Sequence, residues 1–219
     1  MEQKTFVIVP AYNEESNIKR IVIETKKYID NIIVVDDGSK DQTAEEAEKE
    51  GAIVLKHIIN LGKGAALKTG CDYAVEQCAS NIIVLDADSQ HEPSEIPTFL
   101  KELKDVDVVL GYRELNKEMP FILKLGNWLI GKMTKLLYGI YLHDTQCGYR
   151  AFTSDTYKKI RWKSSNYSIE SEMIANIGKK RLRYKEIPIK TIYLDRYKGT
   201  TVIDGIKIVC NLLRWRLSK

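Results

Sequence analysis

Short runs of β-branched residues alternate with amphipathic segments of helical length through the first half of the chain. The apolar runs predict strands at residues 5–9, 31–35, 52–55, 81–85 and 106–110. Apolar spacings of three and four predict helices at residues 14–29, 41–50, 64–77 and 93–103. Such alternation is typical of an α/β fold, because a mostly parallel central sheet needs helices on both faces to cover it.

The apolar periodicity loosens beyond residue 111. The segment at residues 119–141 is rich in Leu, Ile, Trp and Tyr, but Lys124, Lys132 and Lys135 interrupt it. It therefore lacks the roughly 20 consecutive apolar residues of a spanning helix. Two interpretations stay open: the segment lies in a membrane interface with its lysines reaching the headgroups, or it is a buried helix pair packed on the sheet.

The remaining pattern predicts a strand at residues 148–152, helices at residues 168–177 and 202–215, and strands around residues 182–193. We find no internal repeat and no convincing linker. The simplest interpretation is one domain over residues 1–200, followed by a basic amphipathic helix at residues 201–219 that is suited to a membrane surface.

Positive charge is concentrated near the carboxyl terminus. The formal net charge is +4, yet residues 179–219 contain twelve Lys or Arg against three Asp or Glu. Nucleic acid, an anionic membrane, a phosphorylated substrate or plain solvent would each suit this region.

The four cysteines form no Cys-x-x-Cys pair and do not cluster with the three histidines, which argues against a zinc site. The amino terminus lacks a signal-peptide pattern, so we expect a reducing, cytoplasmic location.

Polar motifs follow four of the predicted strands. Because ligands of parallel α/β sheets bind beyond the carboxyl ends of the strands, these motifs are expected to share one site. They are Pro10-Ala-Tyr-Asn-Glu14, Asp36-Asp-Gly-Ser39, Asp86-Ala-Asp-Ser-Gln90 and Gly111-Tyr-Arg113.

The third motif fits a divalent-metal site. Alternate residues at a strand end lie on one side of the chain, so Asp86, Asp88 and Gln90 can face the same cation. Mg²⁺ and Mn²⁺ usually bind through one or two carboxylates plus substrate phosphates, which favours a nucleoside diphosphate as the ligand. The alternative is an ordinary acidic turn after a strand.

Two glycine-containing turns add to the predicted site. Asp36 and Asp37 are placed to accept hydrogen bonds from a nucleobase or ribose, whereas Ser39 and Gln42 fit a capping box for the following helix. In Asn60-Leu-Gly-Lys-Gly64 the glycines permit close backbone approach and Lys63 offers a cation to phosphate. The spacing is not that of a Walker A loop, and no G-x-G-x-x-G follows the first strand, so kinases and dehydrogenases lose support.

Four cationic residues fall outside regular helix faces, and any two of them that converge would form a clamp for an acceptor phosphate. They are Arg113, Arg150, Arg196 and Lys198. His91 borders a helix start or acts as a ligand, and Glu170 and Glu172 are interpreted as acidic residues in the first turn of a helix.

Taken together and in order, six motifs resemble those of family 2 glycosyltransferases with a GT-A fold. Within that family the chain looks like the dolichyl- or polyprenyl-phosphate sugar transferases of the dolichyl-phosphate mannose synthase kind. The motifs are Pro10-Ala-Tyr-Asn-Glu, Val35-Asp-Asp-Gly-Ser-Lys-Asp-Gln-Thr, Gly62-Lys-Gly-Ala-Ala, Asp86-Ala-Asp-Ser-Gln, Gly111-Tyr-Arg and Asp144-Thr-Gln-Cys-Gly-Tyr-Arg-Ala-Phe.

The resemblance implies a role for each matching position. Asp86, Asp88 and Gln90 would bind Mg²⁺ or Mn²⁺ and, through it, the diphosphate, and Arg113 would lie near the acceptor phosphate and the donor sugar. Arg196 and Lys198 match a basic loop that closes over the donor, although the Gly199-Thr-Thr-Val that follows departs from the usual Gly-Glu-Ser-Lys. The nucleoside diphosphate sugar would be held by Pro10, Tyr12, Glu14, Val35, Asp37, Lys63 and Ala87.

The expected reaction is inverting transfer of a UDP- or GDP-linked sugar to an isoprenoid lipid phosphate, with Asp88 and Arg113 among the catalytic residues. A phosphate acceptor is already ionised and needs no general base, whereas a sugar hydroxyl would need one, for which Asp144 is the candidate. We expect a peripheral protein on the cytoplasmic membrane face, with no nucleic acid as a partner. A nucleotidyltransferase and a non-catalytic sugar-nucleotide or RNA-binding module are the rival interpretations.

Overall fold

The computed structural model of the protein describes residues 3–113, 121–165, 168–190 and 202–217. Within these residues seven strands form one sheet in the order β3-β2-β1-β4-β6-β5-β7. Neighbouring strands are parallel except at β6, which runs antiparallel to β4 and β5, so the predicted mostly parallel sheet is confirmed. The strands are β1 (Thr5–Ala11), β2 (Ile32–Asp36), β3 (Ile53–Lys56), β4 (Asn81–Val84), β5 (Val108–Arg113), β6 (Arg150–Thr153) and β7 (Tyr184–Ile189).

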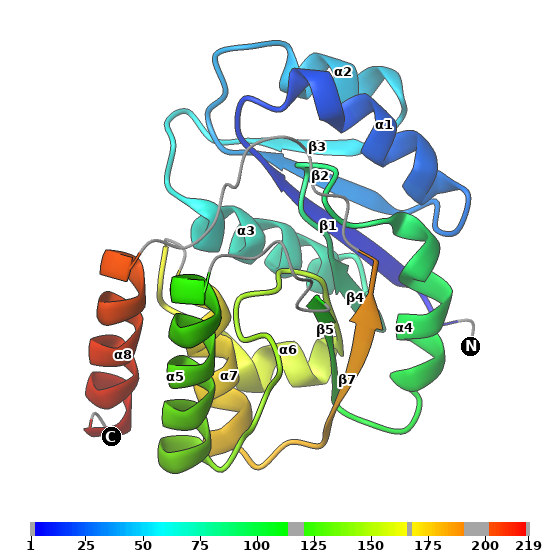
Figure 1. Ribbon diagram of the computed structural model, residues 1–219. Coiled ribbons are helices and arrows are strands. Elements are labelled where there is room, and N and C mark those ends of the chain that lie inside the picture. Colours follow the sequence, from blue (N-terminus) through cyan, green and yellow to red (C-terminus); the bar gives the residue numbers. More distant parts are fainter. Residues whose placement is uncertain (1–2, 114–120, 166–167, 191–201, 218–219) are drawn as a thin grey trace.

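Helices cover both faces of the sheet, as the alternating pattern predicts (Figure 1). Val7 and Val9 of β1 pack against one set of helices, whereas Phe6 and Ile8 pack against the other, because alternate residues of a strand point to opposite faces. The first set comprises α1 (Glu15–Lys26), α2 (Thr43–Lys49) and α4 (Ile96–Glu102), which follows the 3₁₀ turn η1 (Pro93–Glu95). The second set comprises α3 (Lys63–Glu76), α6 (Ser154–Ile160) and α7 (Ile169–Lys179).

The beginnings of α2 and α6 differ from the sequence-based expectations. The predicted capping box of Ser39 and Gln42 is wrong: Ser39 Oγ accepts from the Asn13 N–H at 2.9 Å, and the Thr43 N–H donates to Asp41 Oδ1 at 3.1 Å. Ser39 therefore ties the loops after β1 and β2 together instead of starting a helix. Helix α6 was not predicted, although Thr153 caps it by accepting from the Thr156 N–H at 3.1 Å.

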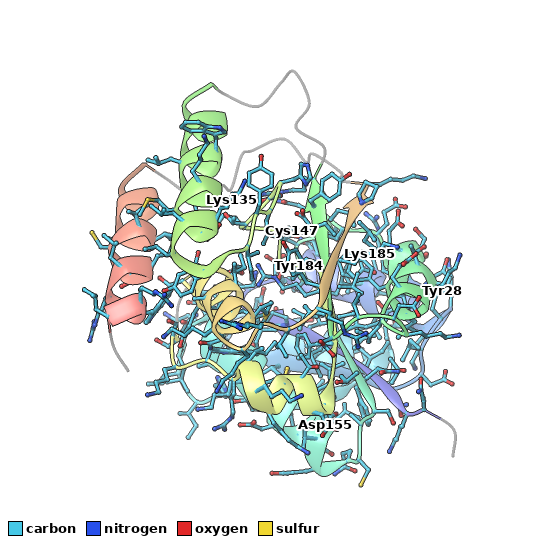
Figure 2. All side chains as sticks on the ribbon, turned by 90° about the horizontal axis from the view of Figure 1, so that it is seen from below. Tyr28, Lys135, Cys147, Asp155, Tyr184 and Lys185 are labelled. Carbon is cyan, nitrogen blue, oxygen red and sulfur yellow. The ribbon has the colours of Figure 1, made fainter. Side chains whose placement is uncertain are left out.

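Two amphipathic helices, α5 (Phe121–Tyr138) and α8 (Val202–Leu217), lie side by side at the edge of the molecule opposite α4 (Figures 1 and 2). The Tyr138 hydroxyl donates to the Leu212 carbonyl at 2.6 Å, and both residues lie in a small apolar cluster with Ile130, Ala175 and Ile208. The predicted apolar segment thus contains the single helix α5, which packs on α7 and α8. One of the two sequence-based interpretations was instead a helix pair packed on the sheet. Searching the described helices finds none long and apolar enough to cross a membrane.

A pair of helix glycines tests how closely α3 packs on the sheet. A Cβ atom on Gly70 of α3 would lie 2.4 Å from Ile8 Cγ2, whereas one on Gly126 of α5 would meet nothing within 4 Å. We expect Gly70→Ala to lower the free energy of unfolding by about 1–3 kcal/mol through overpacking. Gly126→Ala, the matched control, should raise it by about 0.5–1 kcal/mol because alanine is the better helix former. Urea unfolding of both variants measures the difference, and equal effects would contradict the tight packing.

Candidate active site

The polar motifs predicted to share a site do end at one edge of the sheet. Strands β1, β2, β4 and β5 run in the same direction, so their carboxyl ends meet there. Hydrogen bonds join the first two motifs directly: the Asp37 N–H donates to the Ala11 carbonyl at 2.8 Å, and the Lys40 N–H donates to Asn13 Oδ1 at 2.9 Å. The loops after β1 and β2 are therefore one connected part of this edge.

Asp37 anchors the loop between β3 and α3. Its carboxylate is almost fully buried and accepts from the N–H groups of Leu61 and Gly62 at 2.9 and 2.7 Å, while His57 Nδ1 lies 2.7 Å from Oδ1. A Cβ atom on Gly38 would lie 2.6 Å from the Ile59 carbonyl carbon, so the loop can pack this closely only over a glycine. The backbone N–H groups of Leu61 and Gly62 are thus committed to Asp37.

The start of α3 is covered by the segment before α7. The Gly64 N–H donates to the Ser165 carbonyl at 2.8 Å, and Trp162 Nε1–H donates to the Gly64 carbonyl at 2.8 Å. A Cβ atom on Gly64 would lie 2.2 Å from the Ser164 carbonyl oxygen. The close approach predicted at this glycine therefore occurs, but the partner is the chain itself rather than a phosphate.

The predicted nucleoside-binding residues differ in what they can offer a ligand. Tyr12 is 43% exposed and presents its ring at the edge, whereas the Val35 side chain is fully buried in the core, so Val35 can reach a ligand only through its backbone. Glu14 accepts from Asn17 Nδ2 at 2.7 Å, and its charge contributes to raising the pKa of Asp88. Pro10 stands at the end of β1 opposite Val35.

Lys63 joins two carboxylates at the centre of this edge. Its Nζ lies 2.8 Å from Asp86 Oδ1, 3.0 Å from Asp86 Oδ2 and 2.9 Å from Glu170 Oε1. Burial acts to raise the pKa of Asp86, but the nearby positive charges, Lys63 foremost, together outweigh it and lower that pKa. The Asp86 and Glu170 carboxylates raise the pKa of Lys63 despite its burial. Asp86 and Lys63 are therefore both charged at neutral pH.

Asp88 lies in a less favourable environment than Asp86. Burial, and then the negative charge of Asp86, raise the pKa of Asp88, although the Gln90 N–H donates to Asp88 Oδ1 at 3.0 Å. Ala87, between the two aspartates, is buried, as expected for alternation at a strand end. Two neighbouring carboxylates that disfavour each other's ionisation form a site that gains from a cation.

A divalent cation fits these residues. Within the described part of the chain, Asp86 Oδ1 is buried and receives no aligned hydrogen bond, and its close neighbour is the Lys63 ammonium at 2.8 Å. No group of three His, Cys, Asp or Glu side chains capable of holding a metal is found among the described residues. Mg²⁺ and Mn²⁺ do not need such a group, because substrate phosphates and water complete their coordination.

Arg113 and Asp144 form a two-pronged ion pair at the end of β5. Arg113 Nε donates to Asp144 Oδ2 at 2.6 Å and Nη2 donates to Oδ1 at 3.2 Å, while the Gln146 N–H also donates to Oδ1 at 3.0 Å. The Asp144 side chain is 2% exposed and that of Arg113 is 22% exposed. The Arg113 charge contributes to lowering the pKa of Asp86, which brings Arg113 into the same electrostatic site.

Arg150 is not part of a phosphate clamp, contrary to the sequence-based possibility. It is 3% exposed, and its guanidinium donates to the backbone carbonyls of Cys147, Thr145 and Glu170 at 3.0, 3.2 and 3.0 Å. A guanidinium with this many fixed acceptors holds loops together. The expected basic loop residues Arg196 and Lys198 lie outside the described residues.

Buried acidic and imidazole groups near the site were only partly anticipated. Glu172 accepts from the N–H groups of Lys163 and Ser164 at 2.9 and 2.8 Å, so it fixes the segment that covers α3. His91 is 3% exposed, and burial lowers its pKa to about 4, which keeps the imidazole neutral at physiological pH. It stacks on Tyr149 with ring centroids 5.8 Å apart. The sequence marks Glu170 and Glu172 only as helix-start residues, because their partners are distant in the chain.

Residues 6–190 match the family described as glycosyl transferase family 2. The chain belongs to glycosyl transferase family 2. It is 36% identical to the UDP-N-acetylglucosamine–dolichyl-phosphate N-acetylglucosaminyltransferase of Methanococcus voltae, over 98% of this chain and 96% of that protein. It is 26% identical to the undecaprenyl-phosphate mannosyltransferase of Micrococcus luteus, over 98% of this chain and 95% of that protein.

The fold of the chain is also that of a solved glycosyltransferase structure. Glucosyl-3-phosphoglycerate synthase from Mycobacterium tuberculosis, crystallised with Mn²⁺, UDP and glucosyl-3-phosphoglycerate, superimposes with a TM-score of 0.74. The match covers 98% of this chain and 80% of that one at 17% sequence identity, so it establishes the GT-A fold of this glycosyltransferase. The expected family and fold class are confirmed.

Replacing Asp86 by Asn and replacing Asp88 by Asn should change the melting temperature of this glycosyltransferase in opposite directions. The pKa of Asp86 is lowered from 3.8, so its ionisation stabilises the fold above that pH, and Asp86→Asn should lower the melting temperature at pH 7. The pKa of Asp88 is raised, so its ionisation destabilises the fold as the pH rises through that pKa, and Asp88→Asn should raise the melting temperature.

Thermal unfolding of metal-free protein between pH 3 and pH 8 measures both effects, with about 2–4 °C expected per kcal/mol for a chain of this size. The Asp88 difference should shrink as the pH falls towards 3.8, whereas the Asp86 difference should persist until the pH falls through its lowered folded-state pKa. A lower melting temperature for both variants at pH 7 would contradict the opposite roles of the two charges.

Proposed function

We propose that the protein transfers a sugar from a nucleoside diphosphate sugar to an isoprenoid lipid phosphate, with inversion at the anomeric carbon. The observation that carries this proposal is the meeting, at one edge of the sheet, of the Asp86 and Asp88 carboxylates with the Arg113 guanidinium held by Asp144. The carboxylates suit a metal-bound diphosphate and the guanidinium suits an anionic acceptor.

The donor is proposed to lie across the ends of β1, β2 and β4. Tyr12 offers an exposed ring to the base, and the backbone at Val35 lies beside Pro10 at the end of β1. Asp37 can accept a further hydrogen bond from the base or ribose, since a carboxylate has about four lone-pair directions and three donors approach it here. Lys63 provides a cation beside the diphosphate.

Asp86, Asp88 and Gln90 would hold Mg²⁺ or Mn²⁺ in the loaded enzyme, and Ala87 gives the spacing between the two aspartates. A cation held there supplies charge compensation for the departing nucleoside diphosphate. The structure of the Mycobacterium tuberculosis relative contains Mn²⁺ and UDP together, which supports this assignment. Burial and the charge of Asp86 disfavour the ionised form of Asp88, and a cation held there would favour it.

The acceptor site favours a phosphate over a sugar hydroxyl. Both oxygens of Asp144 accept hydrogen bonds from Arg113 or from the Gln146 N–H, so we assign Asp144 the task of orienting Arg113 rather than removing a proton. A phosphate monoester, with its second pKa near about 6, is already ionised at neutral pH and needs no base. The named acceptors of the relatives from Methanococcus voltae and Micrococcus luteus, dolichyl and undecaprenyl phosphate, agree with this choice.

Helices α5 and α8 supply a surface suited to a lipid acceptor. The outward side chains of α5 include Trp128, Leu129 and Leu136, and those of α8 include Leu213 and Leu217, all between 42% and 84% exposed. Lys132 Nζ lies 4.9 Å from the centre of the Trp128 ring, so cationic and aromatic groups alternate on this surface. We assign these helices to peripheral contact with an anionic membrane.

A thermal-shift screen tests the donor and the metal. UDP or GDP, with its cognate sugar, should raise the melting temperature only when Mn²⁺ or Mg²⁺ is present, by roughly 5–10 °C at a hundred times the dissociation constant. Asp88→Asn should fold but lose the shift and the transfer activity. The absence of a metal-dependent shift with any nucleoside diphosphate would refute the proposed function.

Liposome sedimentation tests the membrane surface. Trp128→Ala, Leu136→Ala and Leu217→Ala combined should reduce binding to anionic liposomes by at least about tenfold, because each buried apolar side chain contributes about 1.5–3 kcal/mol. The matched control is Tyr28→Ala, an exposed aromatic residue on the opposite side of the molecule (Figure 2). Unchanged liposome binding of the triple variant would remove these helices from the proposal, while an unchanged thermal shift with donor would show that the site is intact.

A further inference from the structure

The buried contact of Lys63 with both Asp86 and Glu170 has a consequence for cation binding. The side chains are 18%, 20% and 7% exposed, so three charges lie together in a region with little solvent. In such surroundings an uncompensated charge is costly, and the ammonium lies between the two carboxylates that compensate it. The ammonium therefore neutralises the aspartate that is also assigned to the metal.

The backbone on both sides holds Lys63 in this place. It is the first residue of α3, after Gly62 with a φ of 95°, and the Gly62 N–H is fixed by Asp37. The next residue, Gly64, is hydrogen-bonded to Ser165 and Trp162. Because the backbone is fixed on both sides, movement of the ammonium has to come from rotation of the side chain alone.

Glu170 is equally well fixed and keeps spare capacity as an acceptor. It lies in the first turn of α7, and its backbone carbonyl accepts from Arg150 Nη1 at 3.0 Å. The residue is 6% exposed, and within the described part of the chain its Oε2 receives no hydrogen bond. Glu170 is thus an anionic group that can retain Lys63 when Asp86 is taken by another cation.

We propose that Lys63 is the resident counter-ion of Asp86 in the donor-free enzyme, and that Glu170 is the positioning residue that holds it there and draws it aside when a divalent cation binds. This inference rests on the proposed function, because it concerns the same metal and diphosphate site. A metal ion alone has to displace the ammonium from Asp86. A nucleoside diphosphate offers the displaced ammonium a new anion, so metal and nucleotide bind cooperatively.

The charges set the sign of each effect. Removing the ammonium frees Asp86, so Lys63→Met should tighten binding of Mn²⁺ alone and weaken binding of the nucleotide. Removing the Glu170 charge leaves the ammonium with Asp86 as its only partner among the described residues, so Glu170→Gln should weaken binding of Mn²⁺ alone. The double variant removes both charges, so the loss caused by Glu170→Gln should disappear when Lys63 is absent.

Electron paramagnetic resonance of free Mn²⁺ measures these affinities without any turnover, with MnCl₂ alone and with added UDP or GDP. In the wild-type protein the nucleotide should tighten Mn²⁺ binding by about tenfold or more, a typical coupling between two sites. In Lys63→Met, binding of Mn²⁺ alone should be about tenfold tighter and the coupling should fall to about twofold or less. Lys68→Met, which removes the same charge from a partly exposed position on α3, is the matched control and should behave like the wild type.

The double variant Lys63→Met with Glu170→Gln keeps the test informative if a single change prevents folding, since it removes one positive and one negative charge and leaves the net charge of the cluster as in the wild type. Wild-type protein that binds no Mn²⁺ with either nucleotide would contradict the proposed function itself. If Lys63→Met instead binds Mn²⁺ with the affinity of the wild type, and with the same coupling to the nucleotide as Lys68→Met, the counter-ion role alone would be overturned.

Discussion

Compensation of buried charge is the constraint on which the functional edge depends. Asp37, Asp86, Asp144, Glu170 and Glu172 all lie at or below this edge, and each is held by backbone N–H groups or by a cation. These contacts join strand ends to loops and helices far apart in the chain, so the same bonds that give the buried carboxylates their partners also fix the loops. The many acidic side chains at this edge are compatible with a stable fold because nearly all of them have a hydrogen-bond or ion-pair partner in the ligand-free protein.

Much of this architecture follows from local sequence patterns. The spacing of apolar residues predicted the strands and helices of the first half, and strand direction then placed four motifs at one edge. The antiparallel direction of β6 and the short helix α6 were harder to predict, since neither strand direction nor a seven-residue helix has a strong local sequence signal. A parallel sheet is inferred from alternation, yet β6, which follows helix α5, runs antiparallel to β4 and β5.

Side-chain partners across long separations could not be predicted. Arg150 was interpreted as a possible phosphate ligand, but the fold places it among three backbone carbonyls. Glu170 pairs with a lysine more than one hundred residues earlier, and its position at a helix start gives a sufficient local explanation that conceals this. Charged residues reveal their type in a sequence, whereas their burial and partners depend on the completed fold.

The antiparallel strand also acts as a spacer. Because β6 lies between β4 and β5, the strand ends that carry Asp86 and Arg113 are two strand intervals apart, which corresponds to about 10 Å along the sheet. The chain enters β6 through Gly148, where a Cβ atom would lie 2.4 Å from Asp86 Oδ2, so the surface between the two positions has little side-chain bulk beside Asp86. Strand order thus fixes this separation, and under the proposed function one sugar ring has to lie within it, between the donor diphosphate and the acceptor phosphate.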